Sequence, residues 1–88
     1  MSKEDLRKSL ERLHSELDKL EGDNELARER LKHLVSDLEH QLENPDDTTH
    51  RDTLIERLHD FIEQFEVKHP RVTGIANDIM VTLSNLGI

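Results

Sequence analysis

Hydrophobic side chains recur along this chain with the period of an α-helix. In the first stretch, leucines alternate spacings of four and three residues, which is the a/d heptad pattern of a helix that packs along one narrow seam. The seam consists of Leu6, Leu10, Leu13, Leu17 and Leu20. Gly22 follows it and is expected to end the helix in a left-handed conformation. The pattern therefore predicts a first helix from about residue 3 up to Gly22.

Three further apolar stripes of helical period follow the first. The second ends at Asn44-Pro45, because proline cannot continue a helix and restricts the residue before it. The third is expected to begin at Thr49, with Asp52 three residues on as in a capping box. The fourth begins at Pro70, whose missing N–H costs nothing at the first helical position. In chain order the stripes contain Ala27, Leu31, Leu34, Val35, Leu38 and Leu42; Leu54, Ile55, Leu58, Phe61, Ile62 and Phe65; and Val72, Ile75, Ala76, Ile79, Leu83 and Leu86.

The connections between these helices set the expected fold class. Only two or three residues separate the first two helices, and so short a link favours an antiparallel hairpin. Residues 44–50 form a polar linker without large apolar side chains. We therefore predict one all-α domain over 1–88, with a first hairpin at about 3–43 and a second at about 50–88. The two hairpins form a four-helix bundle or pair into a dimeric helical bundle.

Length and cysteine content favour assembly of more than one copy. A chain of 88 residues buries a modest core and often needs added burial from a partner chain, a metal or a disulfide. The chain has no cysteine, which excludes disulfides, thiolate metal sites and thiol nucleophiles. A homo-oligomer, most simply a homodimer, is therefore the expected source of extra burial.

The charge balance narrows the classes of partner. The chain carries 20 acidic and 12 basic side chains, a formal net charge of −8, and the basic residues form no cluster. Binding to a nucleic-acid backbone depends on lysine and arginine, so nucleic acid is not an expected partner. Mimicry of nucleic acid by an acidic protein is consistent with the charge alone. No apolar run approaches the length of a membrane span, and the charged first residues do not resemble a secretory signal. The chain is therefore expected to be soluble and cytoplasmic.

The second hairpin contains a distinctive corner. We interpret Phe65, Val67, His69 and Pro70 as structural: Phe65 closes the third helix on the core and Val67 covers the turn. His69 is then the non-helical residue before Pro70, which restarts the chain.

This corner also carries a resemblance to a known family. Phe65-Glu66-Val67-Lys68-His69-Pro70, followed by Leu83-Ser84-Asn85-Leu86-Gly87-Ile88, resembles a family of short bacterial proteins classed only as a domain of unknown function. The resemblance covers residues 50–88 well and residues 1–44 by pattern. It implies a small all-helical protein of bacterial origin, and it brings no activity, cofactor or catalytic residue.

Six histidines raise the question of a metal site or a pH response. The pairs Glu11/His14 and Glu56/His59 have the Glu-x-x-His spacing of di-iron bundles, but their helical positions point away from the apolar stripes. His33, Asp37 and His40 share one face of the second helix and are weak candidates for holding a transition metal ion. A solvated polar face is the favoured interpretation, so neither a metal nor a cofactor is expected. Protonation of all six histidines would bring the net charge to −2, which keeps a pH response open as a hypothesis.

No pattern for catalysis is present. Ser9, Ser15, Ser36 and Ser84 all fall within predicted helices, and no strand-to-helix turn exposes any of them. The three glycines are scattered and form no phosphate-binding loop. An enzyme is therefore not expected.

The fourth helix is unusually poor in charge. From Val72 to Ile88 the only charged residue is Asp78, and Met80 and Val81 are apolar although they fall outside the main stripe. A weakly charged helix suits an interface. The expected interface residues are Val72, Ile75, Ile79, Met80, Val81, Leu83 and Leu86. We therefore predict protein–protein interaction by an oligomeric adapter or regulatory module without catalysis. The alternative is a metal- or ligand-binding helical protein that uses surface histidine, aspartate and glutamate.

Overall fold

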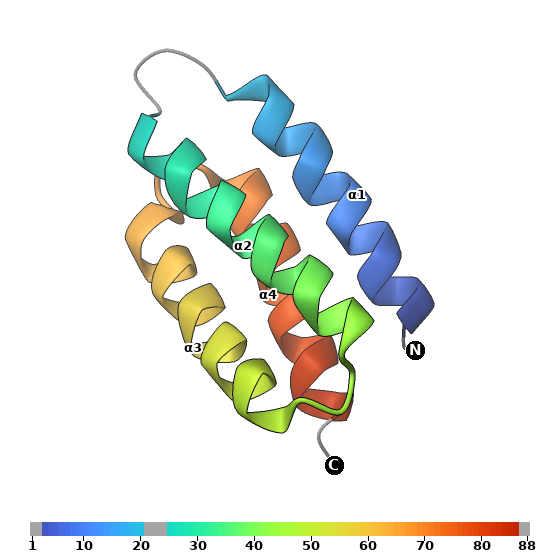
Figure 1. Ribbon diagram of the computed structural model, residues 1–88. Helices are drawn as coiled ribbons and strands as arrows, with labels where there is room; N and C mark the ends of the chain where they lie inside the picture. The colour runs from blue at the N-terminus through green and yellow to red at the C-terminus, as the bar shows by residue number, and fades with distance from the viewer. Residues whose placement is uncertain (1–2, 21–24, 87–88) are drawn as a thin grey trace.

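The computed structural model describes residues 3–20 and 25–86, except for the side chain of Leu86. These residues form α1 (Lys3–Lys19), α2 (Glu25–Glu43), α3 (Thr48–Phe65) and α4 (Pro70–Leu86). The helices run alternately up and down, so that the start of α1 and the end of α4 lie at the same end of the molecule (Figure 1). The predicted all-α fold and the four-helix bundle are confirmed. The helix end predicted at Gly22, and Gly87 and Ile88 of the segment that resembles the family, lie outside the described residues.

Each helix packs against two neighbours. The contacts join α1 with α2, α2 with α3, α3 with α4, and α4 with α1, whereas the diagonal pairs do not approach each other in the described part of the chain. The bundle measures 38 × 21 × 18 Å. Every helix therefore has one stripe facing the centre and one face directed away from the bundle.

The inward stripes join into a single apolar core. Leu13 and Leu31 are fully enclosed, and Leu54, Leu58, Ile79 and Leu83 are each 1% exposed. Leu10, Leu17, Leu42, Ile55, Ile62 and Met80 are half-buried and pack against this cluster. Burial of such side chains is the main favourable term in folding. The heptad seams predicted from the sequence thus meet within one chain.

The helix boundaries agree with the proline positions and differ at one cap. α2 ends at Glu43, directly before Asn44-Pro45, and Pro70 is the first residue of α4. By contrast, α3 begins at Thr48 and is capped by Asp47, whose side chain accepts a hydrogen bond from the His50 backbone N–H. The prediction of Thr49 as the start was wrong, because an aspartate carboxylate reaches the free N–H groups of the first turn better than a threonine hydroxyl.

The corner between α3 and α4 also differs from expectation in one residue. The His69 N–H donates to the Phe65 carbonyl at 2.8 Å, and the rings of the two residues lie 6.1 Å apart. Val67 is 90% exposed and does not cover the turn, contrary to the prediction. The half-buried His69 lies beside Phe65 instead, because the turn directs residue 67 into solvent and returns residue 69 toward the bundle.

A matched pair of leucines in α2 tests the position of the core. We expect Leu31→Ala to lower the free energy of unfolding by about 2–5 kcal/mol, because it leaves a cavity in the enclosed core. Leu26→Ala should change this energy by less than about 0.5 kcal/mol, because Leu26 is 53% exposed. Urea unfolding followed by circular dichroism measures both. Equal losses in the two variants would contradict the described core.

Candidate functional site

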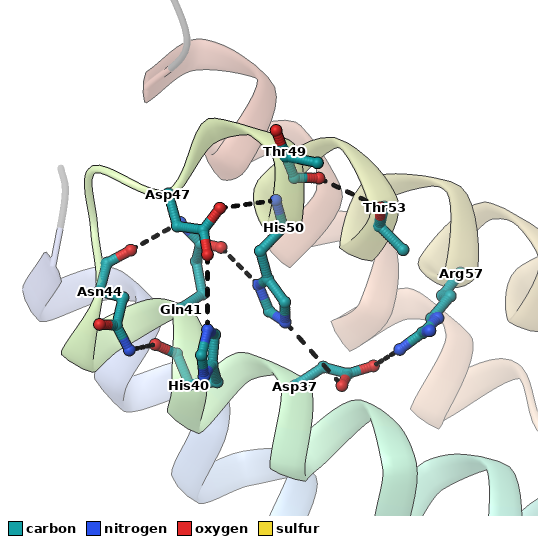
Figure 2. Close-up of polar contacts among 9 residues, drawn as sticks. All are labelled: Asp37, His40, Gln41, Asn44, Asp47, Thr49, His50, Thr53 and Arg57. Atoms are coloured by element: carbon teal, nitrogen blue, oxygen red, sulfur yellow. Dashed lines mark hydrogen bonds and ion pairs between the residues drawn. The ribbon is translucent and has the colours of Figure 1, made fainter.

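The connection between α2 and α3 carries the densest polar network of the described residues (Figure 2). The Asp47 Oδ1 atom accepts the His50 backbone N–H at 3.0 Å, which fixes the first turn of α3. The Asp47 N–H donates to the Asn44 carbonyl at 3.1 Å, and the Asn44 side-chain amide donates to the His40 carbonyl at 3.0 Å. The link between the hairpins is therefore held at both ends by hydrogen bonds.

Two imidazole rings face each other inside this network. The ring centroids of His40 and His50 are 4.3 Å apart, with a tilt of 51° between the planes. His50 Nδ1 lies 2.7 Å from Oε1 of Gln41, a residue that is only 4% exposed. Because an amide oxygen only accepts hydrogen bonds, Nδ1 of His50 is the donor in this contact. The contact satisfies a polar group that would otherwise be costly to bury.

Asp37 joins the network to α3. Its Oδ2 atom accepts a hydrogen bond from Arg57 Nη1 at 2.6 Å, and its Oδ1 atom lies 4.0 Å from His50 Nε2. The Asp37 side chain is 18% exposed, so the pair with Arg57 is partly shielded from solvent. The carboxylate thus contacts both an arginine and an imidazole of α3, and it ties the two helices together.

The three weak metal candidates of α2 have different contacts. Asp37 is paired with Arg57, whereas His40 is directed to Asp47, with 3.6 Å between His40 Nε2 and Asp47 Oδ2. The third candidate, His33, lines an open pocket of about 340 Å³ between α2 and α3. Metal-ligating atoms of different residues must approach a common ion, so this arrangement does not present the three as one ligand set.

Another group of potential ligands does converge. One ligand atom each of His59, Asp60 and Glu63 lies within 4.8 Å of the others on the exposed side of α3. His59 Nδ1 is 4.0 Å from Glu63 Oε1, one helical turn away. The expected outward direction of the Glu-x-x-His pairs also holds, since Glu11, His14, Glu56 and His59 are all exposed.

The helix expected to form an interface uses most of its apolar residues internally. Val72, Ile75, Ile79 and Leu83 are between 1% and 5% exposed, because α1 and α3 cover this side of α4. They are therefore not available to a second chain in this fold. Of the remaining expected residues, Met80 is half-buried, Val81 is 49% exposed, and the side chain of Leu86 lies outside the described residues.

What α4 presents to solvent is a surface with few charges. We define the α4 outer face as Gly74, Asn77, Val81, Ser84 and Asn85, all exposed, flanked by Arg71 and Asp78. Beside it, a groove of about 600 Å³ runs between α4 and α1 and is also lined by Arg12, Glu16 and Lys19. Glu16 lies 3.9 Å from Arg71 Nε and 3.5 Å from Lys19 Nζ, and its side chain is 13% exposed. Around the outer face, charges of both signs therefore lie close to one another.

Comparison with known families decides the membership of this chain. A family model described as Domain of unknown function (DUF4404) matches residues 6–88. The chain belongs to this family. The match spans both hairpins, so the first half of this chain belongs to the family domain as much as the second half does. No curated protein and no solved structure matches this chain.

The family description assigns no activity to DUF4404. Among the helices described for this DUF4404 chain, none has both the length and the apolar character needed to cross a bilayer.

Sequence reasoning missed the centre of the polar network of this DUF4404 chain. Gln41 continues the heptad spacing of Leu34 and Leu38, and a glutamine at such a position signals a buried polar contact. An aspartate three residues before His50, directly after a proline turn, likewise indicates a helix cap. The contact of Gln41 with His50 has no signal in the sequence, because it depends on how α2 and α3 pack.

The network predicts a specific pH dependence of the stability of this protein. The His50 backbone N–H bound to Asp47 lowers the pKa of that carboxyl below its ordinary value of 3.8, against a smaller opposing effect of burial, and the side chain of His40 adds to the lowering. A folded pKa below the unfolded one stabilises the fold above pH 3.8. This stabilisation is lost as the pH falls through the folded pKa.

Asp47→Asn tests this prediction, because asparagine still caps the helix but carries no charge. We expect the wild type to melt at a higher temperature than the variant at pH 6, and the difference to shrink as the pH falls below 3.8. Asp46→Asn is the control, since it removes the same charge from the neighbouring residue and leaves the Asp47 carboxylate and its hydrogen bond to the His50 N–H in place. A wild-type advantage over Asp47→Asn that persists unchanged at about pH 2.5, below the ordinary pKa of an aspartate, would contradict the assignment.

Proposed function

We propose that this protein is a non-catalytic interaction module that associates with a second copy of itself through the α4 outer face. The observation that supports this proposal is the near absence of charge on an exposed helix. Charged residues make up 36% of the chain, yet α4 carries only Arg71 and Asp78. A surface that must lose its water on binding is cheapest to bury where it carries few charges.

The other exposed faces are poorer candidates for self-association. On α2, for example, the exposed residues include Glu25, Arg28, Glu29, Arg30 and Lys32. Two chains that each carry a net charge of −8 repel each other, and this repulsion is smallest where the contact surface is nearly neutral. The same negative charge supports a protein partner over a nucleic acid.

The structure also changes the reason for association. The inward stripes of all four helices are buried within one chain, so a second copy is not needed to complete the core. Association through the α4 outer face then joins two folded bundles, as an adapter or regulatory module requires. Its strength depends on a small apolar contact made by Val81, the one large apolar side chain that is about half exposed on the described part of α4.

Val81→Glu tests the proposed contact surface. Burial of an unpaired carboxylate in the interface should raise the dissociation constant of the dimer at least about tenfold. Leu26→Glu is the matched control, because Leu26 is 53% exposed on α2, which does not contact α4. Sedimentation equilibrium measures both variants, and circular dichroism checks that each remains folded. A dimer unaffected by Val81→Glu, or an entirely monomeric wild type, would overturn the proposal.

A second candidate function is binding of a divalent transition metal ion, favoured by the convergence of His59, Asp60 and Glu63. An imidazole and two carboxylates are suitable ligands for Zn²⁺ or Ni²⁺. All three side chains are exposed, so solvent or a ligand from another molecule would complete the coordination.

Calorimetric titration with Zn²⁺ tests this second candidate. We expect a single binding event that disappears in His59→Ala and persists in His33→Ala, which removes another exposed histidine. Loss of binding in His33→Ala instead would move the site to the face of α2 that carries Asp37 and His40. Wild-type heats equal to those of dilution would reject metal binding altogether.

A further inference from the structure

The only two charges of α4 have opposite signs and a spacing that matters for pairing. Arg71 and Asp78 are seven residues apart, which is about two helical turns, so they lie on the same side of the helix about 10 Å apart. Both are exposed, and the Arg71 side chain is 76% exposed. Arg71 also occupies the first turn of α4, where a cation is unfavourable for the helix dipole. Its place is therefore not explained by the stability of its own helix.

This spacing distinguishes the two ways of packing α4 against α4. In a parallel pair each residue lies level with its own copy, which brings like charges together. In an antiparallel pair centred midway between them, each Arg71 lies opposite the partner's Asp78. The two-fold axis creates this opposite-charge pair twice, because an isologous contact repeats every interaction.

We infer that two copies of this chain pair through antiparallel α4 helices that cross at Gly74, with Arg71 of each copy opposite the partner's Asp78. The inference rests on the proposed function, since it requires the α4 outer face to be the contact. It adds the orientation, the register and the residues that select a second copy as the partner.

Gly74 lies at the crossing point that this register requires. The midpoint between residues 71 and 78 falls between Gly74, which is exposed, and Ile75, which is buried. A Cβ atom added at Gly74 would meet no atom within 4 Å, so the fold of the single chain does not demand a glycine there. Glycine weakens the interior of a helix relative to alanine. Close approach of a second helix would account for a glycine at position 74, because a glycine has no side chain to keep the two helices apart.

The same register brings together two apolar side chains that the single chain leaves exposed. Val81 lies about 3 Å beyond the level of Pro70, the first residue of the partner's α4, and so at the partner's α3–α4 corner, which carries Val67. In one chain Val67 is 90% and Val81 49% exposed, and both lie in the second hairpin. The antiparallel pair would cover Val81 with the partner's corner at each end of the contact.

Charged groups of both signs lie beside the contact. Arg12, Glu16 and Lys19 of α1 line the groove on one side of α4, and Glu66, directly after α3, lines a second groove that also includes Gly74 and Asn77. Glu16 contacts both Arg71 and Lys19 within the chain, so Arg71 divides its charge between Glu16 and the partner's Asp78 when two copies pair.

Charge reversal tests the orientation directly. We expect Arg71→Asp and Asp78→Arg each to raise the dissociation constant roughly tenfold, because each replaces two attractive pairs by two repulsive ones. The double variant restores the opposite pairing and should return within about threefold of wild type. Sedimentation equilibrium at low salt measures all of these constants, because exposed charges are screened at higher ionic strength.

Two controls show whether an effect of charge reversal comes from the pairing itself and not from the net charge or from unfolding. Arg28→Asp on α2 changes the net charge by the same amount as Arg71→Asp and should leave the dimer unchanged. An aspartate in the first turn of α4 favours the helix, which offsets the loss of the exposed Arg71 contact with Glu16, so we expect Arg71→Asp to stay folded, and circular dichroism checks this. Single variants without effect, or a double variant as weak as the single ones, would overturn the antiparallel register.

The absence of cysteine allows an independent test of the same geometry. At the usual spacing of packed helices, the two Gly74 Cα atoms lie about 4–6 Å apart, which is within disulfide range. Gly74→Cys should therefore form a covalent dimer under mild oxidation. In Val81→Cys the two sulfurs are about 20 Å apart along the helices and should not join, whereas a parallel pair would join them.

The outcomes separate this inference from the proposed function. A dimer that is sensitive to Val81→Glu but insensitive to charge reversal, or one that cross-links in the Val81→Cys variant, keeps the α4 contact and rejects the antiparallel register. A wild type that is monomeric, or a dimer insensitive to Val81→Glu, rejects both. Cross-linking in the Gly74→Cys variant alone, together with rescue by the double charge reversal, supports both.

Discussion

Burial of four apolar helix stripes in one common core governs the whole of this molecule. A helix cannot cover its own apolar stripe, so the stripe is buried only by packing against other helices. In this bundle each helix packs on two neighbours. Once Leu13, Leu31, Leu58 and Ile79 are enclosed, the direction of every outward residue follows. The polar network at the α2–α3 link and the nearly uncharged face of α4 are both consequences of this packing.

The core is complete within one chain, and this separates folding from association. A small core suggested that a second copy would be needed for stability, but the apolar residues of α4 are already covered by α1 and α3. Association would then add function to a folded unit and would be reversible, as regulation requires. In that case, substitutions on the outer face of α4 change the dimer without changing the fold.

The two sides of the bundle have different physical characters. Between α2 and α3, Gln41, His50, Asp37 and Arg57 form direct contacts that satisfy one another within the chain. On α4, Gly74 has free space around its Cβ position, and Val81 is 49% exposed. The first surface stabilises the hairpin connection, and the second is the one proposed to contact a second copy.

Residue order was enough to predict the helices, because periodicity and proline act through local backbone geometry. The four stripes, the end of α2 before Pro45 and the start of α4 at Pro70 were all evident from it. Tertiary packing settled that α1 and α3 of the same chain cover the apolar stripe of α4, that Val67 faces solvent, and that His50 meets Gln41. These outcomes depend on which helices become neighbours, and a spacing along one helix carries no information about the helix that packs against it.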